Sequence, residues 1–141
     1  MTDTELVASA IEARERAYVP YSHFAVGAAL LCADGTVICG CNIENAAYTP
    51  SNCAERTAFF RAVFDGHRDF SAIAVVGGPE GQPVSELCAP CGVCRQVMME
   101  FCDPETFRIV LAAKPDEPVS RTLAEILPLG FGPDNLGKQR P

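Results

Sequence analysis

The feature of this sequence that most constrains its fold is a set of cysteines divided between two distant motifs. The first motif is residues 53–56 (CAER), and the second is residues 90–94 (PCGVC). A closely spaced Cys-x-x-Cys pair holds zinc through one turn, and a third thiolate from elsewhere leaves the fourth tetrahedral position open for water. If Cys53, Cys91 and Cys94 bind one zinc ion, the chain must fold so that these motifs meet.

A carboxylate accompanies the first motif. Glu55 lies two residues after Cys53, close enough to a metal-bound water to move protons yet free of the metal itself. Its alternative role is a reciprocal helix cap with Asn52, but the neighbouring cysteine favours the proton-transfer role. Three thiolates on Zn²⁺ leave a net negative charge, which weakens it as a Lewis acid, so Arg56 is expected to compensate beside the sulfurs. The alternative for Arg56 is an ordinary solvated helix arginine.

Hydrophobic periodicity predicts helices alternating with strands after an opening hairpin, which indicates a mixed sheet covered by helices. Both cysteine motifs are expected at helix N-termini, where free amides stabilise thiolates. The predicted helices are 2–17 with a capping box at Thr2, 50–64 capped by Thr49, 91–101 and 123–127. The predicted strands are 24–32, 37–43, 71–76 and 107–112, and residues 77–86, 115–118 and the tail from 128 are predicted loops.

Composition limits the function further. A chain of 141 residues is expected to form one domain, residues 1–141. The net charge of -7 opposes a phosphate backbone, so no nucleic-acid partner is expected. The longest apolar stretch, residues 24–32, is far shorter than the roughly 20 residues that cross a bilayer, so no membrane role is expected. Residues 1–17 hold no signal-peptide core, and the cytoplasm is the expected location.

Five separated motifs together resemble the cytidine deaminases, in particular the small homotetrameric form that binds zinc through three cysteines. The resemblance covers nearly all of residues 21–136. Its motifs are 21–29 (YSHFAVGAA), 40–46 (GCNIENA), 53–56 (CAER), 90–96 (PCGVCRQ) and 127–131 (LPLGF).

This resemblance implies an α/β fold, a three-layer α-β-α sandwich around a mixed five-stranded sheet. It also implies hydrolytic deamination of cytidine and 2'-deoxycytidine to uridine and 2'-deoxyuridine, with release of ammonia. Zinc held by Cys53, Cys91 and Cys94 would activate the water that attacks C4 of the base. Glu55 would take the water's proton and pass it to N3, and later to the departing amine.

The resemblance also implies how the nucleoside is held. Asn42 and Glu44 would bind the ribose 3'-hydroxyl, which both donates and accepts hydrogen bonds. The Phe24 ring would pack against the base, and the amide of Ala54 would meet the base carbonyl. Without the resemblance, the two polar residues read as ordinary strand-end residues and Phe24 as a core residue.

Subunit sharing is a further implication. Each of four identical subunits would hold one Zn²⁺, and Tyr48 and Phe131 would reach into a neighbour's pocket. The alternative for Phe131 is a tail folded onto its own core. The implied cellular role is pyrimidine salvage.

Two other functions remain open from the residues. An aminonucleoside-antibiotic deaminase of the blasticidin S type also uses three cysteines. Alternatively, Cys88 could join Cys53, Cys91 and Cys94 in a closed structural zinc or iron–sulfur site, which would make the protein a binding module. Both histidines are expected on the surface, and the other cysteines are expected to pack as small apolar residues: Cys32, Cys39, Cys41 and Cys102.

Overall fold

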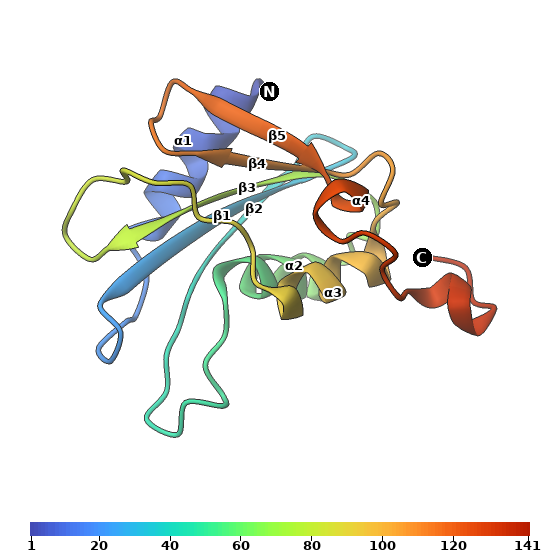
Figure 1. Ribbon diagram of the computed structural model, residues 1–141, viewed down its shortest axis with the longest axis horizontal. Coiled ribbons are helices and arrows are strands. Elements are labelled where there is room, and N and C mark those ends of the chain that lie inside the picture. The colour runs from blue at the N-terminus through green and yellow to red at the C-terminus, as the bar shows by residue number, and fades with distance from the viewer.

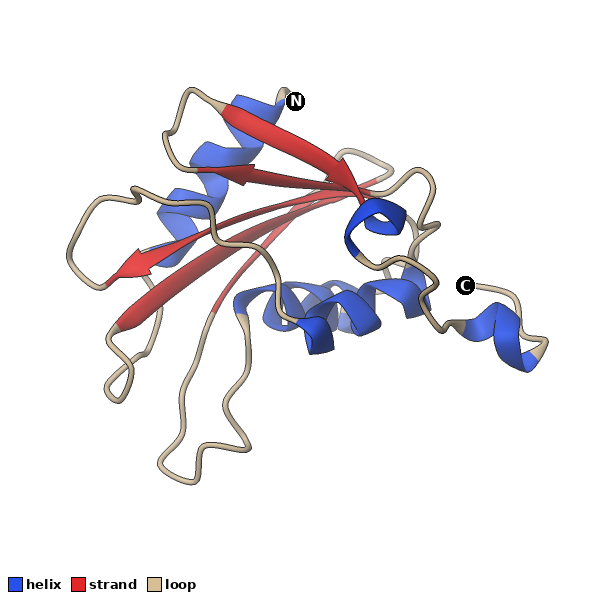
Figure 2. Cartoon of the chain, in the orientation of Figure 1, coloured by secondary structure: helices blue, strands red, loops and turns tan.

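The computed structural model describes residues 1–141 and is built on a five-stranded mixed sheet (Figures 1 and 2). The strand order is β2-β1-β3-β4-β5. Only β3 and β4 run parallel, and every other neighbouring pair is antiparallel. The strands are β1 (Phe24–Cys32), β2 (Val37–Cys41), β3 (Phe70–Pro79), β4 (Arg108–Ala112) and β5 (Pro118–Thr122).

Helices cover both faces of the sheet, which makes three layers. In Figure 1, α1 (Asp3–Arg14) lies on one face, while α2 (Ala54–Phe64) and α3 (Gly92–Phe101) lie side by side on the other. The short α4 (Leu123–Ile126) packs on the same face as α2 and α3, because its Leu123 belongs to their core. The predicted α/β fold with a central mixed five-stranded sheet is confirmed.

The two faces differ in the cores that they form. Nineteen buried residues form the core under α2 and α3, including Phe59, Met98 and Phe107, whereas nine form the core under α1. Alternation along the strands divides the side chains between them: Leu30 and Ile73 face α2 and α3, and their neighbours face α1. The larger core anchors the two helices that carry the cysteine motifs.

Two strand glycines allow both helix layers to approach the sheet closely. A Cβ at Gly27 would lie 2.0 Å from the carbonyl oxygen of Ala10 in α1. On the other face, a Cβ at Gly40 would lie 2.5 Å from the carbonyl oxygen of Ala54 and 2.6 Å from the amide of Ala58 in α2. Real Cβ contacts are longer than this, so any larger residue would displace the helix.

Helix starts show where local signals succeed and fail. The predicted capping box of α1 is present, since Thr2 and Glu5 exchange side-chain-to-backbone hydrogen bonds. The predicted start of the second helix at Pro50 is wrong, because α2 begins at Ala54 with Cys53 as its N-cap. The preceding segment is instead held extended by a two-hydrogen-bond bridge between Ile43 and Asn52.

Three further features differ from the sequence prediction: the end of β3, a fifth strand and a turn in the C-terminal tail. Strand β3 continues to Pro79 because residues 77–79 pair with the start of β1, so the predicted loop begins later. The proline-rich link at 115–118 leads directly into a fifth strand, β5, which the pattern missed because only one of its edges is paired and none of its residues is fully buried. The predicted loop tail contains a 3₁₀ turn, Pro133–Leu136. No helix in the structure has the length and apolar character needed to cross a membrane.

Candidate metal centre and nucleoside pocket

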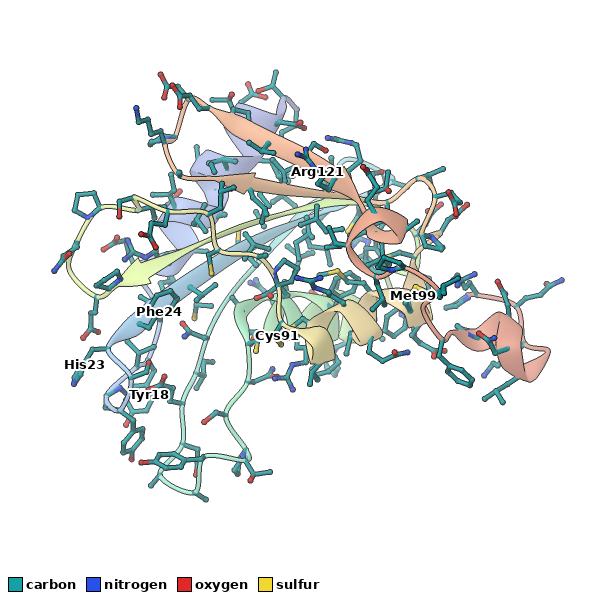
Figure 3. The ribbon with its side chains drawn as sticks, viewed as in Figure 1. Tyr18, His23, Phe24, Cys91, Met99 and Arg121 are labelled. Carbon is teal, nitrogen blue, oxygen red and sulfur yellow. The ribbon has the colours of Figure 1, made fainter.

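The three predicted ligand thiols meet where α2 and α3 begin. Cys53 is the N-cap of α2, Cys91 is the N-cap of α3, and Cys94 lies in the first turn of α3. The Sγ atoms of Cys53 and Cys91 are 3.7 Å apart, and those of Cys91 and Cys94 are 3.4 Å apart. All three sulfurs lie within 4.8 Å of one another, so the fold brings both motifs to one point (Figure 3 labels Cys91).

The surroundings of the Cys53 sulfur favour its thiolate form. The thiol of Cys94 hydrogen-bonds to Cys53, and this contact, with help from Arg56, lowers the pKa of Cys53 to about 5. The same sharing raises the pKa of Cys94. The amide of Cys94 also donates to Sγ of Cys91 at 3.5 Å. Helix N-termini add a partial positive charge at both motifs.

Arg56 lies against the thiolate rather than in solvent. Its Nη2 donates to Sγ of Cys53 at 3.2 Å, and this hydrogen bond raises the pKa of the guanidinium. Its Nε is buried without a hydrogen-bond partner, which is the only such side-chain atom in the chain. The alternative of a freely solvated arginine does not fit these contacts.

Glu55 is one of two buried charged residues, with 4% of its surface exposed. It follows Ala54 in the first turn of α2, beside the Cys53 thiolate. Burial raises the pKa of its carboxyl group, and the negative charge of Cys53 acts in the same direction. A carboxyl group whose pKa is raised toward neutrality can both accept and return a proton. The alternative role in a cap with Asn52 is not realised, because the Asn52 side chain donates to the hydroxyl of Thr57 instead.

The donor set fits zinc and excludes the closed four-thiolate site. Three convergent sulfurs with an adjacent carboxyl group match an open zinc site with three protein ligands. Cys88 does not join them. Its sulfur lies instead over β3, 2.7 Å from the point where a Cβ on Gly77 would stand, and burial raises its pKa to about 11. The hypothesis of a structural zinc or iron–sulfur module is therefore wrong.

A cavity of about 320 Å³ lies beside the loop that leads into Cys91. Its walls are Phe24 at the start of β1, residues 77–79 at the end of β3, and the loop 85–89 that leads into Cys91. Figure 3 shows Phe24 and Cys91 at the starts of two different elements. Sequence reasoning placed Phe24 here but missed the other two walls. Their position between a strand end and a metal motif was the available signal, because such loops commonly carry binding residues.

The predicted ribose-binding residues hold the start of β1. Asn42 accepts a hydrogen bond from the amide of Val26 at 2.9 Å and donates to the carbonyl of Phe24 at 2.8 Å. Glu44 accepts from the amides of Tyr21 and Ser22 and from the Ser22 hydroxyl, which lowers the pKa of its carboxyl group. Neither residue is buried among apolar groups, and both flank the segment that leads to Phe24.

The two residues assigned to a neighbouring subunit do not line the 320 Å³ cavity of their own chain. Tyr48 is 70% exposed on the loop before α2, where its ring meets that of Tyr21 edge to face at 5.9 Å. Phe131 is 55% exposed, with its carbonyl accepting from the Gln96 side chain at 2.8 Å. Ala54, by contrast, is fully buried at the first position of α2, where helical amides lack an intrahelical partner.

Comparison with known proteins agrees with this geometry. Residues 1–110 match the family model described as "Cytidine and deoxycytidylate deaminase zinc-binding region". The chain is 53% identical to the cytidine deaminase of Sporosarcina psychrophila over 94% of this chain and 93% of that protein. It is 33% identical to the blasticidin-S deaminase of Bacillus cereus over 92% of this chain and 91% of that protein.

A solved structure supports the same assignment. The crystal structure of cytidine deaminase from Burkholderia pseudomallei superimposes with a TM-score of 0.83 at 48% identity, covering 93% of this chain and all of that one. The predicted family, fold class and enzyme class are thus confirmed. With a zinc-binding family model matched over most of its length and deaminase relatives across nearly all of it, this chain belongs to the cytidine and deoxycytidylate deaminase family.

Proposed function

We propose that this protein catalyses the zinc-dependent hydrolysis of cytidine and 2'-deoxycytidine, forming uridine or 2'-deoxyuridine and ammonia. The observation that carries the proposal is the buried carboxyl group of Glu55 beside three convergent thiols. A cavity walled by Phe24 and by the loop that leads into Cys91 supports it. Cys53, Cys91 and Cys94 would hold one Zn²⁺ per chain. When bound, zinc supplies the acidity that turns a water molecule into a nucleophile near neutral pH.

Glu55 handles the protons of the reaction. Its carboxylate takes one proton from the attacking water and delivers it to N3 of the base as C4 becomes tetrahedral. It then delivers the second proton of that water to the amino group, which leaves as ammonia. The raised pKa of Glu55 suits a group that must both accept and donate within one turnover. Arg56 offsets part of the thiolate charge through its contact with Cys53.

Residues from the start of β1, the segment after β2 and the start of α2 position the nucleoside. The Phe24 ring supports the flat base, and the free N-terminal amide at Ala54 donates to the base carbonyl. Asn42 donates a hydrogen bond to the ribose 3'-hydroxyl, and the Glu44 carboxylate accepts one from it. Their present hydrogen bonds to the segment before Val26 keep these side chains oriented for that task.

We also propose a homotetramer in which Tyr48 and Phe131 complete a neighbour's pocket. Large apolar side chains that remain exposed on one chain support this arrangement, notably Phe64 at 89% and Phe60 at 50% on α2. Mixing Glu55→Gln chains with Phe131→Ala chains tests it. Partial activity in the mixture, and a mass of four chains by light scattering, would support sharing, whereas a fully active monomer would refute it.

The cellular setting follows from the thiols. All eight cysteines are free, and three must stay reduced to bind zinc, so we propose a cytoplasmic enzyme of pyrimidine salvage. Salvage predicts that a uracil-requiring strain lacking its own deaminase grows on cytidine as its uracil source when it expresses this chain.

The primary test follows the loss of cytidine absorbance together with ammonia release, on a sample whose zinc content is measured. Turnover of both nucleosides at about one zinc per chain is the expected result. Turnover of blasticidin S with neither nucleoside accepted would overturn the substrate assignment. Turnover that persists after complete removal of zinc would overturn the metal assignment.

A further inference from the structure

We propose that this protein holds a second Zn²⁺ site, formed by Cys32, Asp34 and His67. The Sγ atom of Cys32, a carboxylate oxygen of Asp34 and a ring nitrogen of His67 all lie within 4.8 Å of one another. The Nδ1 atom of His67 is 3.9 Å from the Oδ2 atom of Asp34. Thiol, carboxylate and imidazole are the three side-chain donors that zinc accepts, and they converge here from two separate segments.

The backbone fixes these two segments relative to each other. Cys32 ends β1, and its amide donates to the carbonyl of Thr36 at 2.8 Å, which closes the turn that carries Asp34. The next amide, that of Ala33, donates to the carbonyl of Asp69 at 2.9 Å and so ties the turn to the loop that carries His67. The donors are therefore held in place before any metal arrives, which lowers the ordering cost of binding.

Burial of the donors follows the pattern of a metal site open on one side. Cys32 is only 2% exposed and its sulfur makes no hydrogen bond, so it is a buried donor without a partner. The His67 side chain is 23% exposed, less than the surface position expected from the sequence, whereas Asp34 is 62% exposed. A metal ion can thus enter from the Asp34 side, with water as its fourth ligand.

The distances suit zinc after a small adjustment. A tetrahedral zinc at about 2.0–2.3 Å from each ligand keeps those ligands about 3.3–3.8 Å apart. The 3.9 Å separation of His67 and Asp34 is close to this range, and the amide of Thr36 donates to Oδ1 of Asp34 at 2.9 Å, which leaves Oδ2 to face His67. Thiolate and imidazole donors disfavour Mg²⁺ and Ca²⁺, which prefer oxygen ligands alone.

This site is separate from the catalytic centre. Cys53 precedes the first residue of α2, and His67 follows its last, so the two sites lie at opposite ends of a helix about 16 Å long. The C-terminal end of α2 carries a partial negative charge that favours a cation. The guanidinium of the adjacent Arg68 is engaged with the carbonyls of Val63 and His67.

Zinc content of the purified holoenzyme tests the proposal. After equilibration with buffered free zinc raised through the micromolar range, we expect two zinc ions per wild-type chain. His67→Gln and Cys32→Ala should each retain one zinc and full deamination activity. Cys102→Ser is the matched control, because Cys102 is also a 2% exposed core thiol but belongs to no cluster of three possible zinc ligands, and it should keep both zinc ions.

Thermal unfolding gives a second readout that does not depend on activity. Added zinc should raise the Tm of the wild-type holoenzyme, and Mg²⁺ at the same concentration should not. His67→Gln, whose side chain is partly exposed and easily accommodated, should lose this rise. One zinc per wild-type chain at every concentration, or a second zinc that persists in both His67→Gln and Asp34→Asn, would overturn the proposal. Neither outcome would affect the proposed deaminase function.

Discussion

Arg14 and Glu55 are the only buried charged residues of this chain, and they lie on opposite faces of its sheet. Arg14, at the end of α1, is 5% exposed, and Glu55, at the start of α2, is 4% exposed. Although the two side chains are similarly buried, their surroundings stabilise the charge of Arg14 and destabilise that of Glu55. Arg14 supports the fold, whereas Glu55 is the residue proposed to transfer protons.

Arg14 has a backbone acceptor for each of its donor nitrogens and no carboxylate partner. Its guanidinium donates to the carbonyls of Ala25, Gly78, Pro79 and Gln82 at 2.7–3.0 Å. These contacts join α1 to the start of β1 and the end of β3. A buried cation so fully hydrogen-bonded is held in one state, and its role is to fix the backbone.

Glu55 lacks such a set of donors. Burial dominates its electrostatics and raises its pKa, while the negative Cys53 adds to the effect. Its charged form is therefore destabilised by the fold, which is the condition for a group that exchanges protons. Hydrogen-bond satisfaction, rather than burial, therefore separates the structural role of Arg14 from the proton-transfer role of Glu55.

The largest expected effect comes from removing the titratable group. Glu55→Gln should lower kcat by at least about 10²–10⁴-fold, because no other group is placed to move the protons, while zinc content and fold are retained. Its Tm should equal or exceed that of the wild type, since a buried charge is lost. Steady-state kinetics, zinc analysis and thermal melts measure these three quantities.

Glu100→Gln is the matched control, because it makes the same change at an exposed position of α3 and should leave kcat unaltered. Normal turnover by Glu55→Gln would remove the proton-transfer role.

Removing the structural charge should act on stability instead. Arg14→Met leaves four carbonyls without their donor, two of them in buried hydrogen bonds, and should lower the free energy of unfolding by about 3–5 kcal/mol, because each buried acceptor left unsatisfied costs about 1–3 kcal/mol. The zinc-loaded fraction that remains folded should keep a kcat within about tenfold of the wild type. Urea unfolding followed by circular dichroism measures the loss.

The exposed Arg16→Met serves as the control, with an expected change within about 0.5 kcal/mol. If Arg14→Met were equally harmless, the structural role of that guanidinium would be refuted.

A third variant tests the positive charge of Arg56 beside the Cys53 sulfur. Arg56→Ala should reduce zinc affinity or kcat by about 10–100-fold, because the Cys53 sulfur loses the donor that lies 3.2 Å away. Arg56→Lys should recover part of this loss, since it restores the charge but not the planar guanidinium. Competition with a chromogenic zinc chelator gives the affinity, and an unchanged affinity and kcat in Arg56→Ala would contradict the role.

The smallest effect concerns an exposed carboxylate that resembles Arg14 in being well hydrogen-bonded. The Ser22 hydroxyl and neighbouring amides lower the pKa of Glu44. A lowered pKa in the folded state stabilises the fold above the pKa of the unfolded chain, and this contribution is lost as pH falls through the folded value. Glu44→Gln should therefore lower Tm slightly at pH 7.

At pH values below the ordinary glutamate range, the Tm difference between wild type and Glu44→Gln should vanish. Melts recorded across this range provide the check, and a difference that grows on acidification would reverse the sign of the argument.

The part of the site that sequence predicts well is the part built by local rules. Cys53 and Cys91 were expected at helix N-termini, and both are N-caps. The spacing of Cys91 and Cys94 corresponds to one helical turn, so their meeting follows from local geometry alone. Glu55 was identified through its distance from Cys53 along the chain.

What sequence could not supply depends on contacts between distant segments. The start of α2 was misplaced because Thr49 and Pro50 form a good local start signal, which the Ile43–Asn52 bridge overrides. The cavity walls were missed because residues 77–79 become strand only by pairing with β1. Arg14 gave no signal at all, since its four acceptors come from three other segments.

The close approach of α2 to Gly40 has a consequence for the spacing of the metal centre. Because α2 rests on a strand position without a side chain, the height of this helix above the sheet is set by backbone contact. Cys53 and Glu55 lie at the start of α2, whereas Cys91 and Cys94 lie at the start of α3. A displacement of α2 away from the sheet would therefore change the distances between the Cys53 sulfur and the other two. Gly40, which has no side chain, thus helps to set the distances between the sulfurs of the candidate metal centre.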